Sequence, residues 1–241
     1  NDTVSTTLSS CLGNGDGLTS VTIGPDATDD YATINDFFDV LKSSGLCGPI
    51  EAVIKQGTYN EQLVLSNIAG LSAENYVIIR GEGDADQTIV TYTPATDAEN
   101  DAKYVLSIDS VSNITLQDLT ISMTDTTTSY VVAVNHSANI TFNQVTFATP
   151  HSVTPDLLRI GTSNNLSFTD NNFYGSSNQI KTEDAITTLN INNNRFYDFG
   201  TTALNLSAIN NLQINNNSFS TDTSKIELTA VKLSQISNSL S

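Results

Sequence analysis

Four charged side chains in the second half of the chain, Arg159, Lys181, Glu183 and Asp184, have the types needed for chemistry on an acidic sugar polymer. An arginine or lysine beside a carboxylate can neutralise a uronic acid and help to abstract the proton next to its carboxyl group. The separation of Arg159 and Lys181 is close to the repeat length described below, so we expect these side chains on consecutive turns of the fold. A surface salt bridge is the alternative, and no other residues are catalytic candidates.

Oxygen-rich segments suggest a second kind of chemistry. Asp97, Glu99 and Asp101 lie close together in an expected turn, and their carboxylates are the hard ligands that Ca²⁺ takes. Their spacing does not match an EF-hand, and a solvated acidic loop is the alternative. We expect no organic cofactor, and Ca²⁺ is the one ion that these groups suggest. The two histidines, His136 and His151, have no evident carboxylate partner at repeat spacing.

A repeat positions these residues. Asn171, Asn194 and Asn217 recur 23 residues apart, each five residues after the start of a phrase with apolar residues at offsets 0, 2 and 7. Two earlier phrases keep this frame with an apolar residue at offset 5, and a period in this range is typical of stacked repeats. We interpret the three asparagines as a structural ladder, placed in a turn whose backbone is left-handed. A second asparagine column, at 113, 139, 165 and 211, keeps the same phase.

The alternation inside each phrase has period two and predicts strands. No helix-length amphipathic segment separates these strands, so the chain must coil with successive turns pairing in parallel. From Glu51 to the end there is room for roughly eight rungs.

One helix is predicted before the coil, from Thr33 to Gly45, with Thr33 and Asp36 as a capping box and Gly45 just past its end. We expect this helix to cover the first rung, whose backbone groups would otherwise be unpaired. The expected organisation is a single domain, with residues 1–50 as an N-terminal arm and cap and residues 51–241 as rungs. Because nothing caps the last rung, we expect a fragment of a longer protein.

Composition limits the partners. The formal net charge is −17 and only nine residues are Lys or Arg, which excludes a nucleic-acid partner and an anionic membrane surface. No apolar run could span a bilayer. Cys11 and Cys47 are the only cysteines; we expect them to form a disulfide, which indicates a secreted or cell-surface protein, although two separate thiols are the alternative.

Several short motifs resemble a module of large secreted surface proteins of Bacteroidota, commonly exported by type IX secretion. The motifs are 25–26, 30–34, 45–50, 57–62 and 68–70. The remainder is similar to the right-handed parallel β-helix of the pectin-lyase-like superfamily. This resemblance implies an all-β right-handed β-helix solenoid, a fold that carries lyases, esterases and non-catalytic adhesins. Pectin esterases of the superfamily use two Asp and one Arg on adjacent rungs. Tyr197–Gly200 is similar to an esterase motif, but no partner Asp is evident on a neighbouring rung.

These observations favour an extracellular adhesin or stalk module that is non-catalytic and binds glycans. Tyr130, Tyr174 and Tyr197 would stack on sugars if they are exposed. The alternative is a polysaccharide lyase or esterase acting on acidic glycans, against which the strong negative charge counts. We expect a monomeric module within a larger chain, with an extracellular glycan or surface partner and no membrane insertion.

Overall fold

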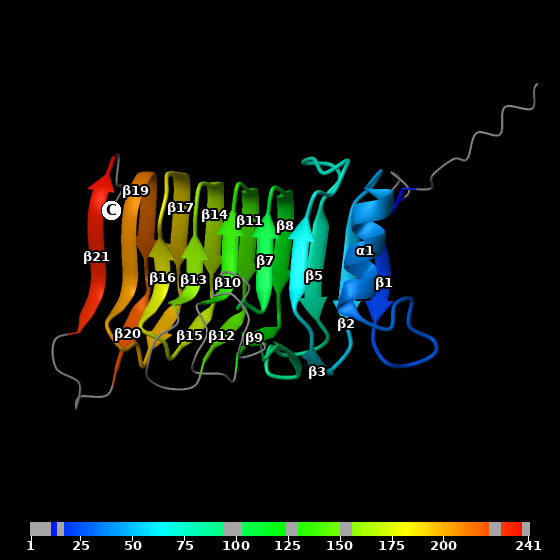
Figure 1. Cartoon of the computed structure of the whole chain (residues 1–241), viewed down its shortest axis with the longest axis horizontal. Helices are drawn as coiled ribbons and strands as arrows, with labels where there is room; N and C mark the ends of the chain where they lie inside the picture. Colours follow the sequence, from blue (N-terminus) through cyan, green and yellow to red (C-terminus); the bar gives the residue numbers. More distant parts are fainter. Residues whose placement is uncertain are drawn as a thin grey trace, which may run out of the picture.

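The fold is a parallel β-solenoid with one helix at its N-terminal end, as Figure 1 shows. The computed structural model describes residues 11–13, 17–93, 103–123, 130–149, 156–221 and 228–237. All named strand pairs are parallel, and each strand inside the coil pairs with strands of the turns before and after it. The predicted all-β parallel β-helix is therefore confirmed, with the right-handed winding that parallel crossovers adopt.

Three faces make up the coil, and we name each by one of its strands. The β7 face faces the viewer in Figure 1; it contains β4 (Leu63–Ser66), β7 (Leu106–Asp109), β10 (Tyr130–Asn135), β13 (Asp156–Ile160), β16 (Asn178–Thr182), the start of β19 (Thr202–Asn215) and β21 (Thr229–Ile236).

The β8 face lies behind it and contains β1 (Thr19–Ile23), β2 (Ile50–Ile54), β5 (Val77–Gly81), β8 (Ser112–Gln117), β11 (Ala138–Asn143), β14 (Asn164–Thr169), β17 (Ile186–Asn192) and the end of β19. The β9 face contains β3 (Gly57–Asn60), β6 (Thr88–Thr91), β9 (Thr120–Ser122), β12 (Thr146–Ala148), β15 (Asn172–Tyr174), β18 (Arg195–Tyr197) and β20 (Ser218–Ser220). Because β19 runs without a break through one corner, it joins the first two faces into one sheet.

The coil makes about six turns, fewer than the roughly eight that we expected. Between Ile50 and Leu212 the chain returns six times to the same position of the β8 face, through residues 77, 114, 140, 166 and 189. The later turns match the predicted repeat. The expected number was too high because the turn from Val77 to Ile114 takes more residues than the later ones.

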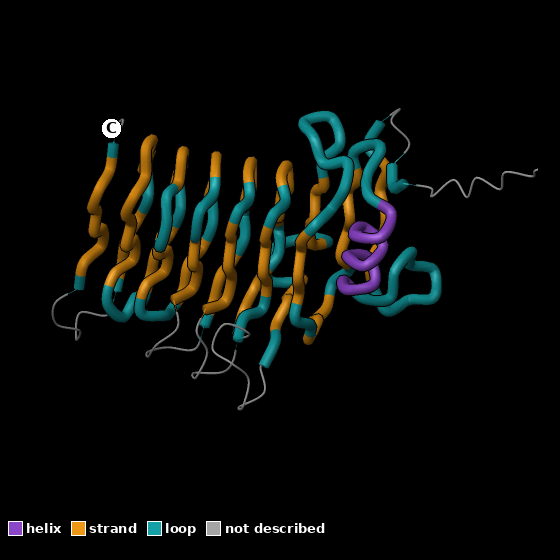
Figure 2. Tube along the Cα trace, turned by 45° about the horizontal axis from the view of Figure 1, so that its top comes forward, coloured by secondary structure: helices purple, strands orange, loops and turns teal. Residues whose placement is uncertain are grey.

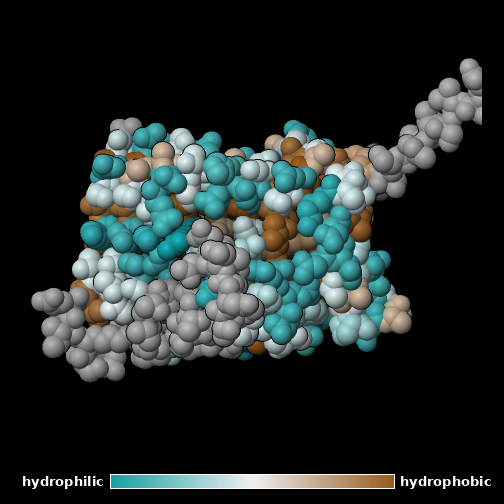
Figure 3. All heavy atoms as spheres, in the orientation of Figure 1, coloured by the Kyte–Doolittle hydropathy of each residue, from teal (hydrophilic) through white to brown (hydrophobic). Residues whose placement is uncertain are grey.

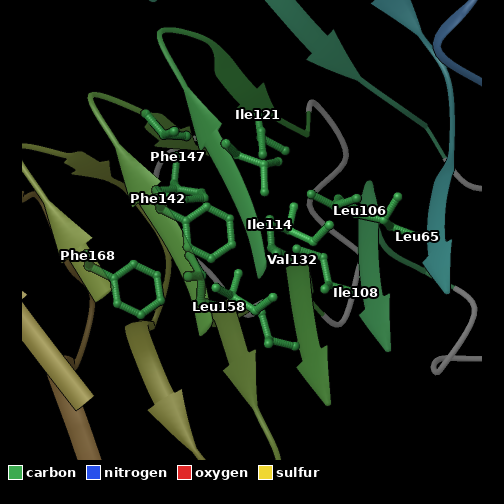
Figure 4. Packing of buried hydrophobic residues seen from close by; sticks show 14 of the residues in the cluster. Leu65, Leu106, Ile108, Ile114, Ile121, Val132, Phe142, Phe147, Leu158 and Phe168 are labelled. Carbon is green, nitrogen blue, oxygen red and sulfur yellow. The ribbon is translucent and has the colours of Figure 1, made fainter. Parts of the chain in front are cut away.

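The core lies inside the coil, where alternate side chains of the three faces meet (Figure 4). Equivalent residues of successive turns lie directly above one another: the Phe142 and Phe168 rings are 5.1 Å apart and nearly parallel, and the Phe173 and Phe196 rings are 4.5 Å apart. This vertical register follows from the period-two alternation combined with in-phase parallel pairing. A rung therefore presents its outward side chains at fixed, repeating positions.

Helix α1 (Ile34–Ser44) covers the first rungs at one end of the coil, as predicted (Figure 2). Thr33 and Asp36 form the capping box, and Ile34, Phe37, Phe38 and Leu41 are buried. The Glu61 carboxylate accepts hydrogen bonds from the backbone N–H groups of Ile34 at 3.1 Å and Asn35 at 2.9 Å. Glu61, the residue after β3, thus pairs two N–H groups of the helix N-terminus that have no partner within the helix, and this contact holds the helix against the coil.

Two covalent and polar features complete the scaffold. Cys11 and Cys47 form the expected disulfide, with 5.7 Å between their Cα atoms.

Asn171, Asn194 and Asn217 are stacked, and each amide oxygen accepts a hydrogen bond from the backbone N–H of the asparagine or valine one turn earlier, at 2.8 to 2.9 Å. The left-handed backbone that we placed at these asparagines is instead found one residue earlier, at 170, 193 and 216. The preceding residue makes the bend, so that the ladder asparagine itself can point inward.

Candidate functional site

The outer surface of the β7 face carries a column of outward-pointing side chains. Arg159 of β13 pairs in register with Lys181 of β16, and Ala133 of β10 and Asn205 of β19 continue the column on either side. The flanking residues of each strand point inward and are buried, so the column faces out. Figure 3 shows this face as largely hydrophilic over β13 and β16.

A quartet of charges forms on this column. Arg159 Nε lies 3.4 Å from both Asp156 Oδ2 and Glu183 Oε1. Lys181 Nζ lies 3.2 Å from Asp156 Oδ2 and 3.1 Å from Glu183 Oε1. The structure therefore brings together three of the four residues that the sequence suggested, on neighbouring rungs, and adds Asp156. We call Asp156, Arg159, Lys181 and Glu183 the charge quartet.

The fourth predicted residue, Asp184, lies beside the quartet. The ion pairs found among the described residues include the other three candidates and not Asp184. Its carboxylate is close to Gly161, where an added Cβ would be 3.5 Å from Asp184 Oδ2 and only 2.1 Å from Asn135 Oδ1. Asp184 is exposed, so it borders the charge quartet without contributing an ion pair to it.

The two carboxylates of the charge quartet differ in how far their side chains are exposed, and this difference separates their roles. The Asp156 side chain is only 8% exposed, whereas that of Glu183 is 39% exposed. Asp156 Oδ1 also accepts a 2.7 Å hydrogen bond from Asn178 Nδ2, so both of its oxygens are engaged. Asp156 is suited to hold the two cations in place, and Glu183 is the carboxylate that a ligand could reach.

Electrostatics favour the charged form of Lys181. Burial lowers the pKa of its ammonium group, but the hydrogen bonds and charges of Glu183 and Asp156 outweigh this effect and raise the pKa above its ordinary value. Lys181 is therefore a fixed cation at neutral pH rather than a proton acceptor. Binding of a carboxylate and stabilisation of a developing negative charge are the roles open to it.

Tyr130 and Tyr104 stack on each other, and Tyr130 also contacts Arg159 of the charge quartet. The Arg159 guanidinium lies 5.2 Å from the centre of the Tyr130 ring, and the Tyr130 and Tyr104 rings stack 5.9 Å apart. Tyr130 is only 8% exposed, so its ring positions Arg159 and offers little area for a sugar. Tyr174 and Tyr197, the other predicted stacking residues, lie on the β9 face with 4.9 Å between their rings. The three tyrosines thus do not form one site.

His136 has a carboxylate partner that sequence analysis missed. Its Nδ1 lies 2.9 Å from Asp109 Oδ1, on the neighbouring rung. Asp109 pairs in register with Asn135 rather than with His136, so the contact is offset by one residue and the repeat spacing alone did not indicate it. His136 has a φ of 46°, and this bend follows the strand end. His151 lies outside the described residues.

Metal binding is not supported by a cluster in the described part of the chain. Asp97, Glu99 and Asp101 lie outside the described residues. Among the residues that the structure describes, no group of three His, Cys, Asp or Glu side chains converges as a metal site would require. The calcium site stays a sequence-based expectation.

Comparison with solved structures finds proteins with a similar fold. The rice weevil pectin methylesterase superposes with a TM-score of 0.61 at 12% identity, covering 89% of this chain and 68% of the enzyme. An Aspergillus niger pectin methylesterase gives 0.59 at 14% identity, covering 94% and 76%. Pectin methylesterase PemA from Erwinia chrysanthemi gives 0.57 at 14% identity, covering 84% of this chain and 66% of the enzyme.

At these identities the similarity establishes the fold alone. No known family matches the sequence, and no curated protein matches it. The chain spans 66% of the length of the pectin methylesterase solved with a hexasaccharide, which is 16% identical with a TM-score of 0.56. Within the described residues, no helix is long and apolar enough to cross a membrane. The chain is therefore a parallel β-helix that shares the architecture of pectin methylesterases.

Proposed function

We propose that this chain hydrolyses esters on a pectin-like, uronate-containing polysaccharide at the outer surface of β13 and β16. The observation that carries the proposal is the charge quartet: two carboxylates, an arginine and a lysine from neighbouring rungs meet on one face of the coil. The resemblance to pectin esterases implies two Asp and one Arg on adjacent rungs; the charge quartet is similar but has Glu183 in place of one Asp. The shared architecture of solved pectin methylesterases supports the same proposal.

Each residue has a role that follows from its exposure. Glu183 is the accessible carboxylate; it acts as general base and takes a proton from the water that attacks the ester carbonyl. Arg159 and Lys181 stabilise the negative charge that develops on the carbonyl oxygen. Asp156 holds both cations. The carbonyl–oxygen bond to the alcohol then breaks, the proton passes to the leaving alkoxide, and one water is consumed for each acid and alcohol released.

A second candidate is a non-catalytic glycan-binding module of an extracellular adhesin or stalk. It is favoured by one observation: each cation of the charge quartet contacts both carboxylates, so the four charges cancel and the catalytic groups are engaged with one another. In this case the same surface would bind a glycan without changing it. The disulfide between Cys11 and Cys47 fits a secreted protein in either case.

Methanol release from methyl-esterified polygalacturonan tests the proposal. The wild-type protein is expected to release methanol, and Glu183→Gln is expected to lower kcat/KM by about 100-fold, as removal of a general base does. Asp184→Asn is the matched control, because it neutralises the adjacent exposed carboxylate and leaves the charge quartet intact. If the wild-type protein binds the polymer but releases no methanol, ester hydrolysis is refuted and glycan binding is the better function. Equal activity of Glu183→Gln and the control would refute the assigned site.

A further inference from the structure

A groove of about 390 Å³ lies where β7 and β10 end, apart from the charge quartet. The segment that follows β4 forms one wall; in Figures 1 and 2 this loop stands above the ends of the neighbouring strands. The turns that lead from β7 to β8 and from β10 to β11 form the other wall. Its lining includes the apolar side chains of Ile68, Leu71 and Val111 and the polar side chains of Ser110, Ser112 and His136.

Asp109 determines which nitrogen of His136 is free. An ionised carboxylate can only accept hydrogen bonds, so the 2.9 Å contact requires that His136 Nδ1 carries the proton and donates it to Asp109 Oδ1. In the neutral imidazole the other nitrogen, Nε2, then has an unshared electron pair and is an acceptor. The His136 side chain is 68% exposed, so this acceptor is available to a ligand in the groove.

The backbone fixes this pair in place. His136 has a φ of 46°, and its N–H donates to the Thr162 carbonyl oxygen at 2.6 Å. Ser110 has a φ of 57°, and its hydroxyl donates to the same Asp109 oxygen at 3.3 Å. Left-handed backbone is uncommon for residues other than glycine, although histidine tolerates it better than most, and it recurs at other turns of the coil, such as Asp118 and Gln144. Here it directs Ser110 and His136 into one groove.

We propose that this groove binds a neutral pyranose unit, with His136 Nε2 accepting a hydrogen bond from a ring hydroxyl. A pyranose has an apolar C–H face and a rim of hydroxyl groups, which match the half-buried Leu71 side chain on one wall and the polar groups of Ser110, Ser112 and His136 on the other. The volume is within the range of small-ligand sites. A negatively charged sugar is disfavoured, because the Asp109 carboxylate lies in the site and the whole chain carries a net charge of −17.

The groove lies close to the strands that carry the charge quartet. Asp109 pairs in register with Asn135, and Asn135 in turn lies against Gly161 at the end of β13. A glycan that crosses the rungs of the β7 face could reach both places. The pyranose proposal does not rest on ester hydrolysis, because its evidence is the groove and the Asp109–His136 pair alone.

Imidazole nitrogen NMR of the full chain tests this proposal. The chain has only two histidines, 136 and 151, so their signals can be assigned with single substitutions. Methyl glycosides of glucose, galactose and mannose are titrated to about 50 mM, above the millimolar Kd typical of weak single-unit binding. We expect His136 to be in the Nδ1–H form before titration. At least one glycoside should then shift its Nε2 signal saturably.

Two substitutions define the outcome. His136→Asn keeps a residue that tolerates the left-handed backbone, and it should weaken binding about tenfold, the effect of one lost hydrogen bond. Asp109→Ala should release the imidazole from the Nδ1–H form and weaken binding similarly. Gln144→Asn is the matched control, because it also places an asparagine at a left-handed position (φ of 54°), after β11 and outside the groove lining. This variant should bind the glycoside as the wild type does.

Absence of a saturable shift with all three glycosides would overturn the proposal. So would unchanged affinity in His136→Asn, provided that circular dichroism shows the variant folded. His136→Asn is expected to keep the methanol release of the wild type. A failure of sugar binding with normal esterase activity therefore refutes only the groove, and the reverse result refutes only the charge quartet's role.

Discussion

Replacing Asn194 with alanine removes the centre of the asparagine ladder. Its Nδ2 donates to the Phe168 carbonyl oxygen at 2.9 Å and to Asn217 Oδ1 at 3.0 Å. Its Oδ1 accepts from the backbone N–H of Asn171 at 2.9 Å and from Asn171 Nδ2 at 3.0 Å. Asn194 is 1% exposed, so water cannot reach the groups that are left without partners.

The magnitude follows from the two buried backbone groups that lose the Asn194 side chain as a partner. The Phe168 carbonyl and the Asn171 N–H each lose the side-chain partner that the ladder supplies, whereas Asn171 Nδ2 keeps its bond to the Phe142 carbonyl oxygen. An unsatisfied buried polar group costs about 1–3 kcal/mol. We therefore expect Asn194→Ala to lower the free energy of unfolding by about 4 kcal/mol, a large share of the usual 5–15 kcal/mol.

Urea unfolding followed by circular dichroism measures this change. Asn192→Ala is the matched control, two residues away, where the side chain accepts only an exposed 3.1 Å hydrogen bond from Asn215; we expect it to change stability by less than about 0.5 kcal/mol. If Asn194→Ala unfolds at the same urea concentration as Asn192→Ala, the ladder does not stabilise the coil and the reasoning is wrong.

Two further predictions concern the cap and the charge quartet. Gly70 has a φ of 84°, and an added Cβ would lie 2.1 Å from the Leu46 carbonyl oxygen, so Gly70→Ala should destabilise the chain by more than about 2 kcal/mol. Gly200→Ala is the control in thermal unfolding, because an added Cβ there would have its nearest neighbour at 3.2 Å. Equal melting temperatures of the two variants would contradict the prediction. The raised pKa of Lys181 implies stability that is present below the ordinary value of 10.5 and is lost as pH rises through the raised pKa. As the pH is raised from neutral, the stability difference between wild type and Lys181→Met should therefore begin to shrink only above pH 10.5. A difference that already shrinks at neutral pH would exclude this ion pairing.

The coil was predictable because its signal is repeated. The frame that starts at Ile140, Leu166 and Leu189 gives the inward face of one strand per turn, and the structure pairs these residues in register. The helix cap was predictable because Thr33 and Asp36 are a local signal. The turn count was not, because the longer early turns interrupt the period before it is established.

The charge quartet and the groove show why sites were harder to predict than strands. Asp156 lies three residues before Arg159 and reaches Lys181 only because β13 and β16 are neighbours. Asp109 and His136 meet one residue out of register, at strand ends where the backbone is left-handed. Contacts at strand ends depend on the local bend of the chain, and the bend is not encoded in apolar periodicity.

The net charge of −17 disfavours an acidic substrate and is compatible with ester hydrolysis. A highly methyl-esterified polyuronate is nearly neutral, so the field of the protein does not repel it. Hydrolysis converts each ester into a carboxylate, and the product is then repelled over about the Debye length of 8 Å at physiological salt. Because Asp156 and Glu183 offset the charges of Arg159 and Lys181, the charge quartet attracts the anionic product less strongly than two unpaired cations would. Under the proposed function, the charge distribution therefore favours the esterified polymer over its product and promotes product release.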